Sequence, residues 1–348
     1  MLINMKRYLI TGGAGFIGSN LTKYLIDQGS HVTVFDNLSR RGTDTNLQWL
    51  QETLPKDKLT YISGDIRNSD SIKNAVRNID CIVHLAAQVA VTTSVTDPKE
   101  DFDINALGTF NVLEAARAQD KKPHVIYTST NKVYGGMEEV KVVEGKTRYS
   151  YEKENFCVPE SIPLDFHSPY GCSKGTGDQY VRDYARIYSI PTTVLRMSCI
   201  YGTRQFGIED QGWLAWMAIA CTVGKNISIY GDGKQVRDIL FVEDLIRLIE
   251  LVSNTPEKSS GEIFNVGGGL KNTISVWSEY GPMLEKELGR KIAVKFSDWR
   301  AGDQRIYVSD ISKVKSILGW EPKVNVETGI HKMVTWIKNN PELFNKFH

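Results

Sequence analysis

Tyr170 and Lys174 are four residues apart in the stretch "HSPYGCSKG" and could carry out acid–base chemistry together. Ser168 is suited to cap a helix and Pro169 to be its first residue, so we expect a helix that begins at about residue 169. Side chains at positions i and i+4 share one helix face. A lysine cation beside a phenol favours the phenolate and lowers a pKa that starts near 10. The pair therefore predicts a tyrosine that acts as a general base near neutral pH.

A second candidate lies in "TSTNKVYGG", where three hydroxyl side chains, Thr128 to Thr130, end an apolar run. Hydroxyls at the end of a buried strand favour a binding or catalytic site. The next two residues are Asn131, an amide, and Lys132, an amine. An amide does not transfer protons as a carboxylic acid does, so this turn offers no acidic pair beside Thr130.

The stretch "ITGGAGFIGSNL" carries Gly12, Gly15 and Gly18 between an expected strand and an expected helix that starts near Phe16 and Ile17. Glycines at these places permit a tight turn, a close approach of the backbone to a diphosphate, and close packing of helix on strand. The helix start offers free N–H groups to the anion.

An acidic residue, Asp36, ends the next expected strand, where it can accept hydrogen bonds from a ribose and repel a 2′-phosphate. The predicted cofactor is therefore NAD. Arg40 and Arg41 follow closely and could neutralise such a phosphate, which leaves NADP as the alternative.

These residues need a scaffold, and the first two thirds of the chain alternate apolar strand-like runs with helical patterns. Strands that are apolar throughout and separated by helices indicate a parallel sheet covered on both faces. We predict an α/β doubly wound (Rossmann) fold, with ligands at the carboxyl ends of its strands. The expected strands are 7–11, 31–36, 59–65, 81–87, 124–130, 192–198 and 262–268.

The rhythm loosens after about residue 199, which predicts a smaller, discontinuous C-terminal domain for the substrate. The expected division is 1–199 plus about 236–269 for the dinucleotide-binding domain and about 200–235 plus 270–348 for the second domain. Residues 137–167 are polar and Tyr-rich without clear periodicity. A segment of that length predicts a lid or substrate loop.

Bulk composition excludes several classes. The chain has 348 residues, 42 Lys plus Arg and 41 Asp plus Glu, a net charge of +1 that gives no support for nucleic-acid binding. No apolar run is long enough to span a bilayer and the start lacks the features of a signal peptide, so we expect a cytoplasmic protein without membrane association. The five cysteines are scattered, which favours reduced thiols and no metal site.

Together with the glycine-rich turn, "GDIRN", "HLAAQ" and "YGCSK" resemble the extended short-chain dehydrogenase/reductase family of nucleotide-sugar enzymes along almost the whole chain. The resemblance implies that Asp65 and Ile66 cradle the adenine, that Asn105 supports the central helix, and that Lys174 also holds the nicotinamide ribose. The cofactor-binding residues that it implies in addition to the glycines and Asp36 are Phe16, Ile17, Asn37, Ser39, Arg40, Leu85, Ala86, Ala87, Thr128 and Tyr170.

The same resemblance implies a reaction. Thr130 would bond the sugar hydroxyl that Tyr170 deprotonates while NAD⁺ takes a hydride from the same carbon. Sugar 4,6-dehydratases carry Asp-Glu where this chain has Asn131-Lys132, so we expect an epimerase, in which the hydride returns to the other face. A UDP-hexose 4-epimerase, a net keto-sugar reductase using Cys199 or His167, and a non-catalytic NAD-binding sensor are the alternatives. The sensor is disfavoured because such proteins usually lack the Tyr/Lys pair.

On the substrate side, arginines suit bidentate binding of a diphosphate. The resemblance implies that Arg237 and Arg300 clamp the nucleotide diphosphate and that Asp303 bonds its ribose, with Arg204 as a further candidate. The motifs "STNKVYG", "LDFHSPYGCSKG", "YGTRQF" and "GKQVRD" are most similar to the branch of 2-epimerases for CDP-linked 3,6-dideoxyhexoses. That branch converts CDP-paratose to CDP-tyvelose for lipopolysaccharide O-antigen. It implies contacts to the sugar from Gln88, Thr93, Asn131 and Ser198.

Members of this family often pair across a two-fold axis through the helix that bears the catalytic tyrosine and the long helix before it, here about 98–118. Phe110, Leu113 and Ile187 are apolar residues that could serve such an interface or the sheet. A homo-oligomer, dimer or tetramer, is therefore expected.

Overall fold

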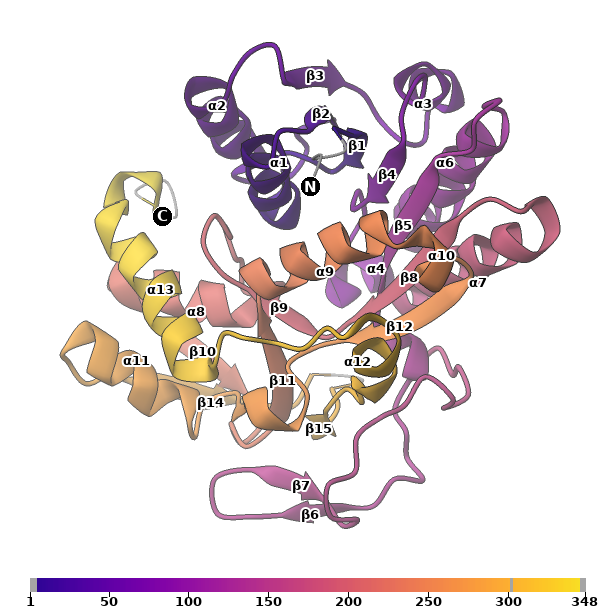
Figure 1. The fold of residues 1–348 in the computed structure, drawn as a ribbon. Helices are drawn as coiled ribbons and strands as arrows, with labels where there is room; N and C mark the ends of the chain where they lie inside the picture. The colour runs from indigo at the N-terminus through magenta and orange to yellow at the C-terminus, as the bar shows by residue number, and fades with distance from the viewer. Residues whose placement is uncertain (1–4, 301–302, 345–348) are drawn as a thin grey trace.

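The structure is a computed structural model that describes residues 5–300 and 303–344. Its main sheet has seven strands in the order β12-β8-β5-β4-β1-β2-β3, and every neighbouring pair is parallel (Figure 1). This confirms the predicted α/β doubly wound fold, and all seven expected strands form. Their bounds are β1 Arg7–Thr11, β2 His31–Asp36, β3 Leu59–Ser63, β4 Cys81–His84, β5 His124–Thr130, β8 Thr192–Met197 and β12 Glu262–Val266.

Helices cover both faces of this sheet. Successive residues of a strand point to opposite faces, so Leu9 of β1 packs into one apolar cluster and Ile10 into the other. The cluster with Ile10 includes side chains of α1 Phe16–Asp27, α2 Thr43–Thr53 and α9 Val242–Asn254. The cluster with Leu9 includes side chains of α3 Ser69–Ala75, α6 Gly108–Arg117 and α7 Pro169–Tyr188.

Helix α7 begins where the sequence predicts. The Ser168 side chain caps it by accepting the Gly171 N–H at 3.0 Å, and Pro169 is its first residue. The helix ends at Ser189, which has a left-handed backbone with φ of 53°. Tyr170 therefore lies in the first turn, at the edge of the sheet where the parallel strands end.

The long helix expected at about 98–118 forms with an irregularity in its middle. It consists of α5 Pro98–Phe102, a π-helical segment η1 Asp103–Leu107, and α6. Short α4 Val91–Thr96 precedes it. A π turn holds one more residue than an α turn and occurs frequently at functional sites.

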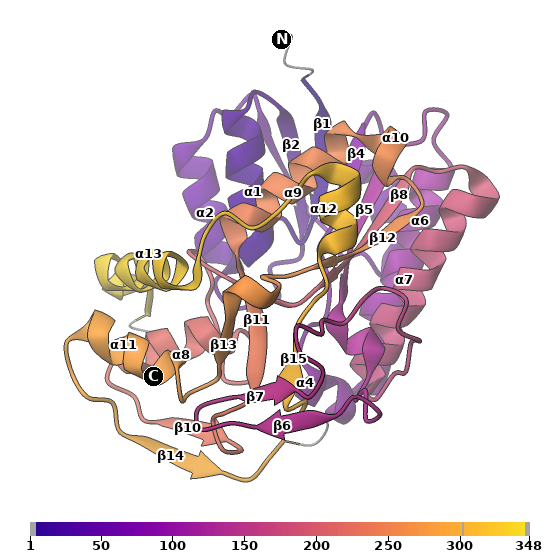
Figure 2. The same cartoon turned by 60° about the horizontal axis from the view of Figure 1, so that its bottom comes forward.

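The second half of the chain adds two small sheets below the main one (Figure 2). Strand β11 Val236–Phe241 pairs with β9 Cys199–Tyr201, β13 Thr273–Ser275 and β15 Ile306–Tyr307, whereas β10 Ile227–Tyr230 pairs with β14 Val294–Ser297. This part of the chain also contains helices α8 Trp213–Thr222, α11 Tyr280–Leu288, α12 Ser312–Leu318 and α13 Val326–Asn339. The short helix α10 Pro256–Ser259 follows α9.

The expected division placed residues 236–269 with the main sheet. In the structure, α9 and β12 pack on or join that sheet, but β11 at 236–241 joins the small one. An apolar strand pattern does not state its partners, which are set by pairing over long sequence distances. The division into two domains stays a prediction. We call the two small sheets and the helices beside them the predicted substrate half, and β11 belongs to it.

Residues 137–167 are more ordered than an unpatterned loop. They contain an antiparallel hairpin, β6 Val142–Glu144 and β7 Tyr149–Tyr151, that projects at the bottom of Figure 1 and lies beside β15 in Figure 2. Tyr149 and Tyr151 pack in an apolar cluster with Ile306 and Tyr307. Aromatic residues on a two-stranded ribbon thus dock this segment onto the substrate half. None of the helices within the described ranges is long and apolar enough to cross a membrane.

Candidate active site

The end of β5 and the start of α7 bring the predicted catalytic residues together. The Thr130 hydroxyl lies close enough to the Tyr170 phenol to act on its pKa as a hydrogen-bond partner. Both are buried, at 7% and 9% exposure. Lys174 lies one turn further along α7 and is 3% exposed. The predicted trio therefore forms one buried group at the carboxyl edge of the sheet.

Burial raises the pKa of the Tyr170 phenol to about 12, and the Thr130 hydrogen bond and the Arg40 charge oppose this rise. The sequence predicts that Lys174 lowers this pKa. In the structure the Lys174 ammonium instead donates to the Thr128 carbonyl at 2.6 Å and lies 4.2 Å from the centre of the Tyr127 ring. Burial lowers the pKa of Lys174 to about 7. The lysine is thus held for a proton exchange near neutrality, behind the tyrosine.

A buried hydrogen-bond network, most of which no sequence pattern indicates, holds the start of α7. The Ser173 hydroxyl donates to Asp101 at 2.5 Å, and the Asn105 amide donates to both Asp101 and Ser173 at 3.1 Å. Ser94 accepts the Tyr170 N–H at 3.1 Å. Asn105 was predicted to support this region, whereas Ser94, Asp101 and Ser173 were missed because single buried hydroxyls and carboxylates leave no spacing pattern.

The glycine-rich turn has the geometry of a diphosphate cradle. Gly12 has φ of +69°, and a Cβ there would lie 2.8 Å from the Ala86 nitrogen. A Cβ on Gly18 would lie 2.3 Å from the Gly12 carbonyl oxygen. Gly15 caps α1 without a side chain, and the first turn, which begins with Phe16 and Ile17, contains no acidic residue. The helix N-terminus is therefore open to an anion, as predicted.

Asp36 lies beside this turn at the end of β2. Its carboxylate accepts N–H groups from Ala14 at 3.0 Å and Leu38 at 2.8 Å, and it is 8% exposed. Burial raises the pKa of this carboxyl, and the two N–H groups oppose that rise. A carboxylate has about four acceptor sites, so two remain for ribose hydroxyls. The residues present thus fit NAD.

The other predicted cofactor residues follow the same edge of the sheet. Asn37 donates to Asp65 at 2.9 Å and accepts the Ser39 N–H at 3.1 Å. Arg67 holds the pKa of Asp65 at about 2. Ile66 packs against α6, where a Cβ on Gly108 would lie 2.5 Å from its side chain.

Residues that follow β4, and Thr128 near the end of β5, lie at the same edge of the sheet. Leu85 donates its N–H to the Thr11 carbonyl at 3.0 Å, and Ala86 and Ala87 continue past Gly12. The Thr128 hydroxyl donates to the His84 carbonyl at 3.0 Å. Arg40 reaches across to Gln211 of the substrate half at 2.7 Å.

On the substrate side, the structure brings Arg237 and Asp303 together. Their side chains form an ion pair at 2.7 Å, and Arg237 is 7% exposed. Arg300 lies over the Tyr230 ring at 4.0 Å and pairs with Asp210 at 3.3 Å. The two arginines that the sequence predicts as a clamp are thus held by separate acidic partners.

The remaining predicted sugar contacts differ in availability. Asn131 is 8% exposed and accepts the Thr130 hydroxyl at 3.4 Å, so it lies at the catalytic end. The Ser198 hydroxyl bonds the buried Asp238 carboxylate, and the Gln88 amide folds back onto the Ala90 backbone. Thr93 is exposed on α4.

Arg204 is placed apart from the Arg237–Asp303 pair. It adopts a left-handed backbone with φ of 65°, and its guanidinium lies 3.9 Å from the Trp49 ring and 5.7 Å from the Trp336 ring. These contacts tie α2 to α13. Arginine in a sequence motif signals a cation, but the sequence alone did not distinguish a phosphate ligand from an aromatic stacking partner.

Lys132 and Cys199 lie on the substrate side of the catalytic trio. Burial and the charge of Arg237 lower the pKa of the Lys132 ammonium to about 8, while Asp303 and Cys199 act in the opposite direction. Burial raises the pKa of the Cys199 thiol, which keeps it protonated near neutrality. His167 instead bonds Asp165 at 2.7 Å.

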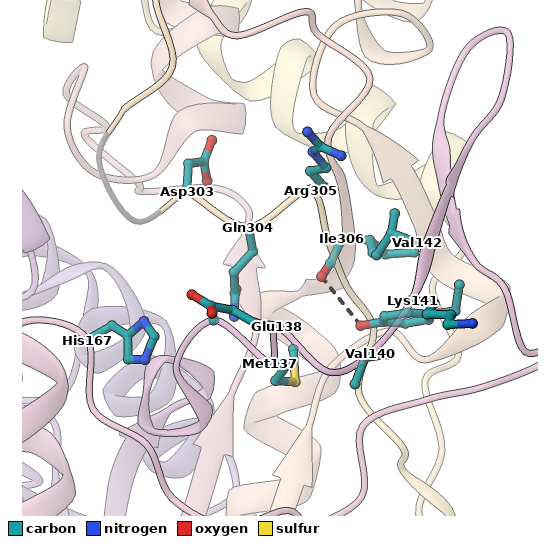
Figure 3. Close-up of a pocket in the computed structure, with 12 residues that line it drawn as sticks. Met137, Glu138, Val140, Lys141, Val142, His167, Asp303, Gln304, Arg305 and Ile306 are labelled. Carbon is teal, nitrogen blue, oxygen red and sulfur yellow. Dashed lines mark hydrogen bonds between the residues drawn. The ribbon is translucent and has the colours of Figure 1, made fainter.

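A cavity of about 460 Å³ opens between the hairpin segment and the strand leading to β15 (Figure 3). His167, Glu138 and Asp303 line it, and Gln304 points into it from above. Gln304 donates to the Gly135 carbonyl, and its own carbonyl oxygen is buried without a partner. This cavity adjoins the ends of both catalytic segments, because Gly135 follows the Asn131–Tyr134 turn and His167 precedes α7.

Within residues 5–300 and 303–344, no group of three or more His, Cys, Asp or Glu side chains is arranged to hold a metal ion.

Comparison with known proteins agrees with this geometry. The model of the GDP-mannose 4,6-dehydratase family matches residues 9–333. The chain belongs to this family of extended short-chain dehydrogenases/reductases. CDP-paratose 2-epimerase of Salmonella typhi is 43% identical over 339 residues, which cover 95% of this chain and 98% of the relative. A putative UDP-glucose 4-epimerase of Methanocaldococcus jannaschii is 33% identical, with 95% and 98% covered.

Solved structures show the same architecture. UDP-glucose 4-epimerase of Thermotoga maritima, solved with UDP-glucose, superposes with a TM-score of 0.81 at 30% identity and covers 96% of this chain and 99% of its own. A dTDP-glucose 4,6-dehydratase of Streptomyces venezuelae, solved with NAD, gives a TM-score of 0.84 at 29% identity, with 98% and 100% covered. The cofactor of this family member is NAD, and its activity is of the nucleotide-sugar epimerase and dehydratase type.

Proposed function

We propose that this protein is a nucleotide-sugar epimerase that oxidises one sugar carbon transiently and then reduces it from the other face. The most specific form of the proposal is epimerisation at C2 of CDP-paratose to give CDP-tyvelose. One observation carries it: Thr130, which lies beside the Tyr170 phenol, is followed directly by an amide and an amine, Asn131 and Lys132. The similarity to the Salmonella typhi enzyme supports the choice of carbon and nucleotide.

The chemistry follows from the placement of the side chains. The Thr130 hydroxyl orients the sugar hydroxyl. The Tyr170 phenol, with its pKa of about 12, is protonated at neutral pH, so it must first lose this proton. The positive charge of bound NAD⁺ would favour the phenolate, which then takes the proton of the sugar hydroxyl as the carbon becomes a ketone. NAD⁺, when bound, supplies the hydride acceptor and returns the hydride later. Lys174, with its pKa near 7, can exchange a proton with its surroundings behind the phenol. Tyr170 returns the proton after the keto sugar has presented its other face, so protons and electrons balance within one turnover.

Elimination of water would demand more of the site. A dehydratase must remove a proton from one carbon and protonate a leaving hydroxyl on the next, which calls for a further acid and base. The turn after Thr130 supplies neither a carboxylic acid nor a carboxylate. This supports epimerisation over dehydration, although the family model takes its description from a dehydratase.

A UDP-hexose 4-epimerase is the second candidate. It is favoured by the fold similarity to the Thermotoga maritima enzyme and by the 33% identical relative. Both candidates use the same trio and differ in the carbon that Tyr170 faces and in the nucleotide that the substrate half holds.

Turnover without added cofactor tests the proposal. Purified protein is denatured and its supernatant assayed for NAD, and native protein is incubated with CDP-paratose or with UDP-glucose. Formation of the 2-epimer, followed by NMR, supports the proposal, and turnover of UDP-glucose alone favours the second candidate. A requirement for stoichiometric NADPH would exclude epimerisation. Tyr170→Phe serves as the inactive control, because it should lower kcat by about 100-fold or more while CDP still binds.

The proposal includes a homo-oligomer. Phe102, Phe110, Tyr180 and Ile187 are exposed apolar side chains on the α5–α6 helix and on α7. The Phe110 and Tyr180 rings touch edge to face at 6.0 Å, which makes the patch continuous between the two helices. Leu113, by contrast, is fully buried in the cluster against the main sheet. We expect sedimentation equilibrium to show a dimer or tetramer, and Phe110→Arg to shift it towards monomer.

A further inference from the structure

Lys132 is the residue of the catalytic end that the proposed chemistry leaves without a role. It belongs to the 3₁₀ turn η2 Asn131–Tyr134, and its N–H donates to the Thr130 hydroxyl oxygen at 3.2 Å. Its carbonyl oxygen would lie 3.2 Å from a Cβ on Gly171, the residue after Tyr170. The backbone of Lys132 therefore lies between Thr130 and the first turn of α7.

Its side chain leaves this turn towards the substrate half. Lys132 as a whole residue is half-buried, and in the described part of the chain no hydrogen bond or ion pair is made by its ammonium. The charged groups that act on it are Arg237 on β11 and Asp303, and the Cys199 thiol on β9 faces it. Such a cation without a partner costs free energy unless an anion compensates it.

The charges in this corner do not balance. Lys132 and Arg237 contribute two positive charges, Asp303 contributes one negative charge through its 2.7 Å pair with Arg237, and Cys199 is a neutral thiol near pH 7. The neighbouring carboxyl, Asp238, is not among the groups that act on Lys132: it is bonded by Ser198 and Gly269, and burial raises its pKa. One positive charge is left over in a partly desolvated place. Ammonium groups bind phosphate oxygens through charge-assisted hydrogen bonds, which are stronger there than in water.

We propose that Lys132 binds the phosphate attached to the sugar and thereby sets which carbon of the ring faces Tyr170. This inference rests on the proposed function, because it assumes that a nucleoside diphosphate sugar occupies this site.

The connectivity of the sugar explains how one cation can select a carbon. In a nucleoside diphosphate sugar, C1 carries the phosphate and C2 is bonded directly to C1, whereas C4 lies across the ring. The reacting hydroxyl is held at Thr130, two residues before Lys132. When that hydroxyl is on C2, the sugar-side phosphate falls next to the same turn. When it is on C4, the ring lies between the hydroxyl and the phosphate.

The electrostatics of Lys132 agree with an anion ligand. Its pKa of about 8 reflects burial and the charge of Arg237, which outweigh Asp303 and Cys199. A bound phosphate adds a negative charge and raises this pKa, so binding favours the protonated amine. Affinity for the diphosphate should therefore decline as pH rises above about 8 and Lys132 loses its proton before binding.

The test compares two nucleotides on the intact holoenzyme by isothermal titration calorimetry. CDP carries the sugar-side phosphate and CMP does not. Lys132→Met should weaken CDP binding about 10- to 100-fold and change CMP binding by no more than about twofold. Lys132→Arg, which keeps the charge, should retain most of the CDP affinity. Lys146→Met is the matched control, because Lys146 is exposed in the turn between β6 and β7 and does not line the cavity.

Two results would overturn the inference: unchanged CDP affinity in Lys132→Met, or an equal loss for CDP and CMP. NAD content and the thermal midpoint show whether each variant is folded. If wild-type protein prefers UDP to CDP and leaves CDP-paratose unchanged, the proposed substrate is wrong. The same comparison made with UDP and UMP then tests Lys132 independently.

Discussion

The cofactor half and the substrate half of this protein build their sites in different ways. Near the cofactor, the backbone conformation forms the predicted binding site. The left-handed Gly12, the close contact at Gly18 and the open start of α1 lie within seven consecutive residues. Near the substrate, side chains do it. Arg237 and Asp303 form one ion pair although 66 positions separate them.

This difference indicates which part of a binding site can be predicted from the local sequence. A backbone cradle needs particular residues at fixed short spacing, so its pattern is visible in the sequence. A side-chain clamp needs only that the fold bring charged residues together. A local sequence pattern does not indicate which charged residues from distant positions will meet. Four substitutions test this contrast, beginning with the one whose effect should be greatest.

Gly18→Ala should affect the cofactor half most strongly. The added Cβ would lie 2.3 Å from the Gly12 carbonyl oxygen, so the diphosphate turn must open. We expect a loss of NAD affinity of about 100-fold, or about 3 kcal/mol, measured by fluorescence titration of NAD-stripped protein. CDP binding should persist. If CDP affinity falls equally, the two halves are not separable in this way.

Arg237→Met should give the reverse result. Removing the guanidinium leaves Asp303 without its partner and takes a cation from the clamp. We expect CDP to bind about 10- to 100-fold more weakly by calorimetry, with the NAD content unchanged. Loss of NAD from this variant would contradict the contrast between the halves.

Lys174→Met should change how stability depends on pH. The pKa of Lys174 is about 7 in the folded protein, below its ordinary value near 10.5, so between these values the unfolded chain binds a proton that the folded chain does not. Wild-type stability therefore gains a contribution from this group that rises with pH from about 7 to 10. Urea unfolding at pH 7, 8 and 9 should show a shallower rise for the variant. Parallel curves would mean that Lys174 stays charged in the folded protein.

Arg204→Met should have the smallest effect. The Arg204 guanidinium lies over the Trp49 and Trp336 rings, and loss of these contacts should lower the free energy of unfolding by about 0.5 to 1 kcal/mol. CDP affinity should stay at the wild-type value in calorimetry. A tenfold weaker affinity would instead place Arg204 in the clamp, for which the sequence makes it a further candidate.

Much of the fold was predictable because each of its elements leaves a local pattern. Buried parallel strands read as apolar runs, and the Ser168–Pro169 start of α7 is a helix signal that a single sequence carries. The pairing of β11 with the small sheet was not predictable, since its apolar residues fit either sheet.

The candidate site divides similarly. The spacing of Tyr170 and Lys174 indicated that they share a helix face, and the family resemblance added Thr130; the structure brings all three to one edge of the sheet. That the Lys174 ammonium bonds the Thr128 carbonyl was not visible, because carbonyl directions depend on how α7 packs on β5. The stacking of Arg204 depends on α2 and α13 meeting, which no local pattern records.

The π-helical segment Asp103–Leu107 sets the rotation about the helix axis between the residues before it and the residues after it. On its first side Asp101 faces Ser173 of the catalytic helix, and on its far side Asn111 donates to the Ile66 carbonyl at 2.9 Å. Each residue of an α-helix turns by about 100°. Deleting one residue within the segment would therefore leave the helix intact but in register with only one of its two neighbours. A single-residue deletion there should therefore change the position of Ile66 relative to Tyr170 without altering either residue.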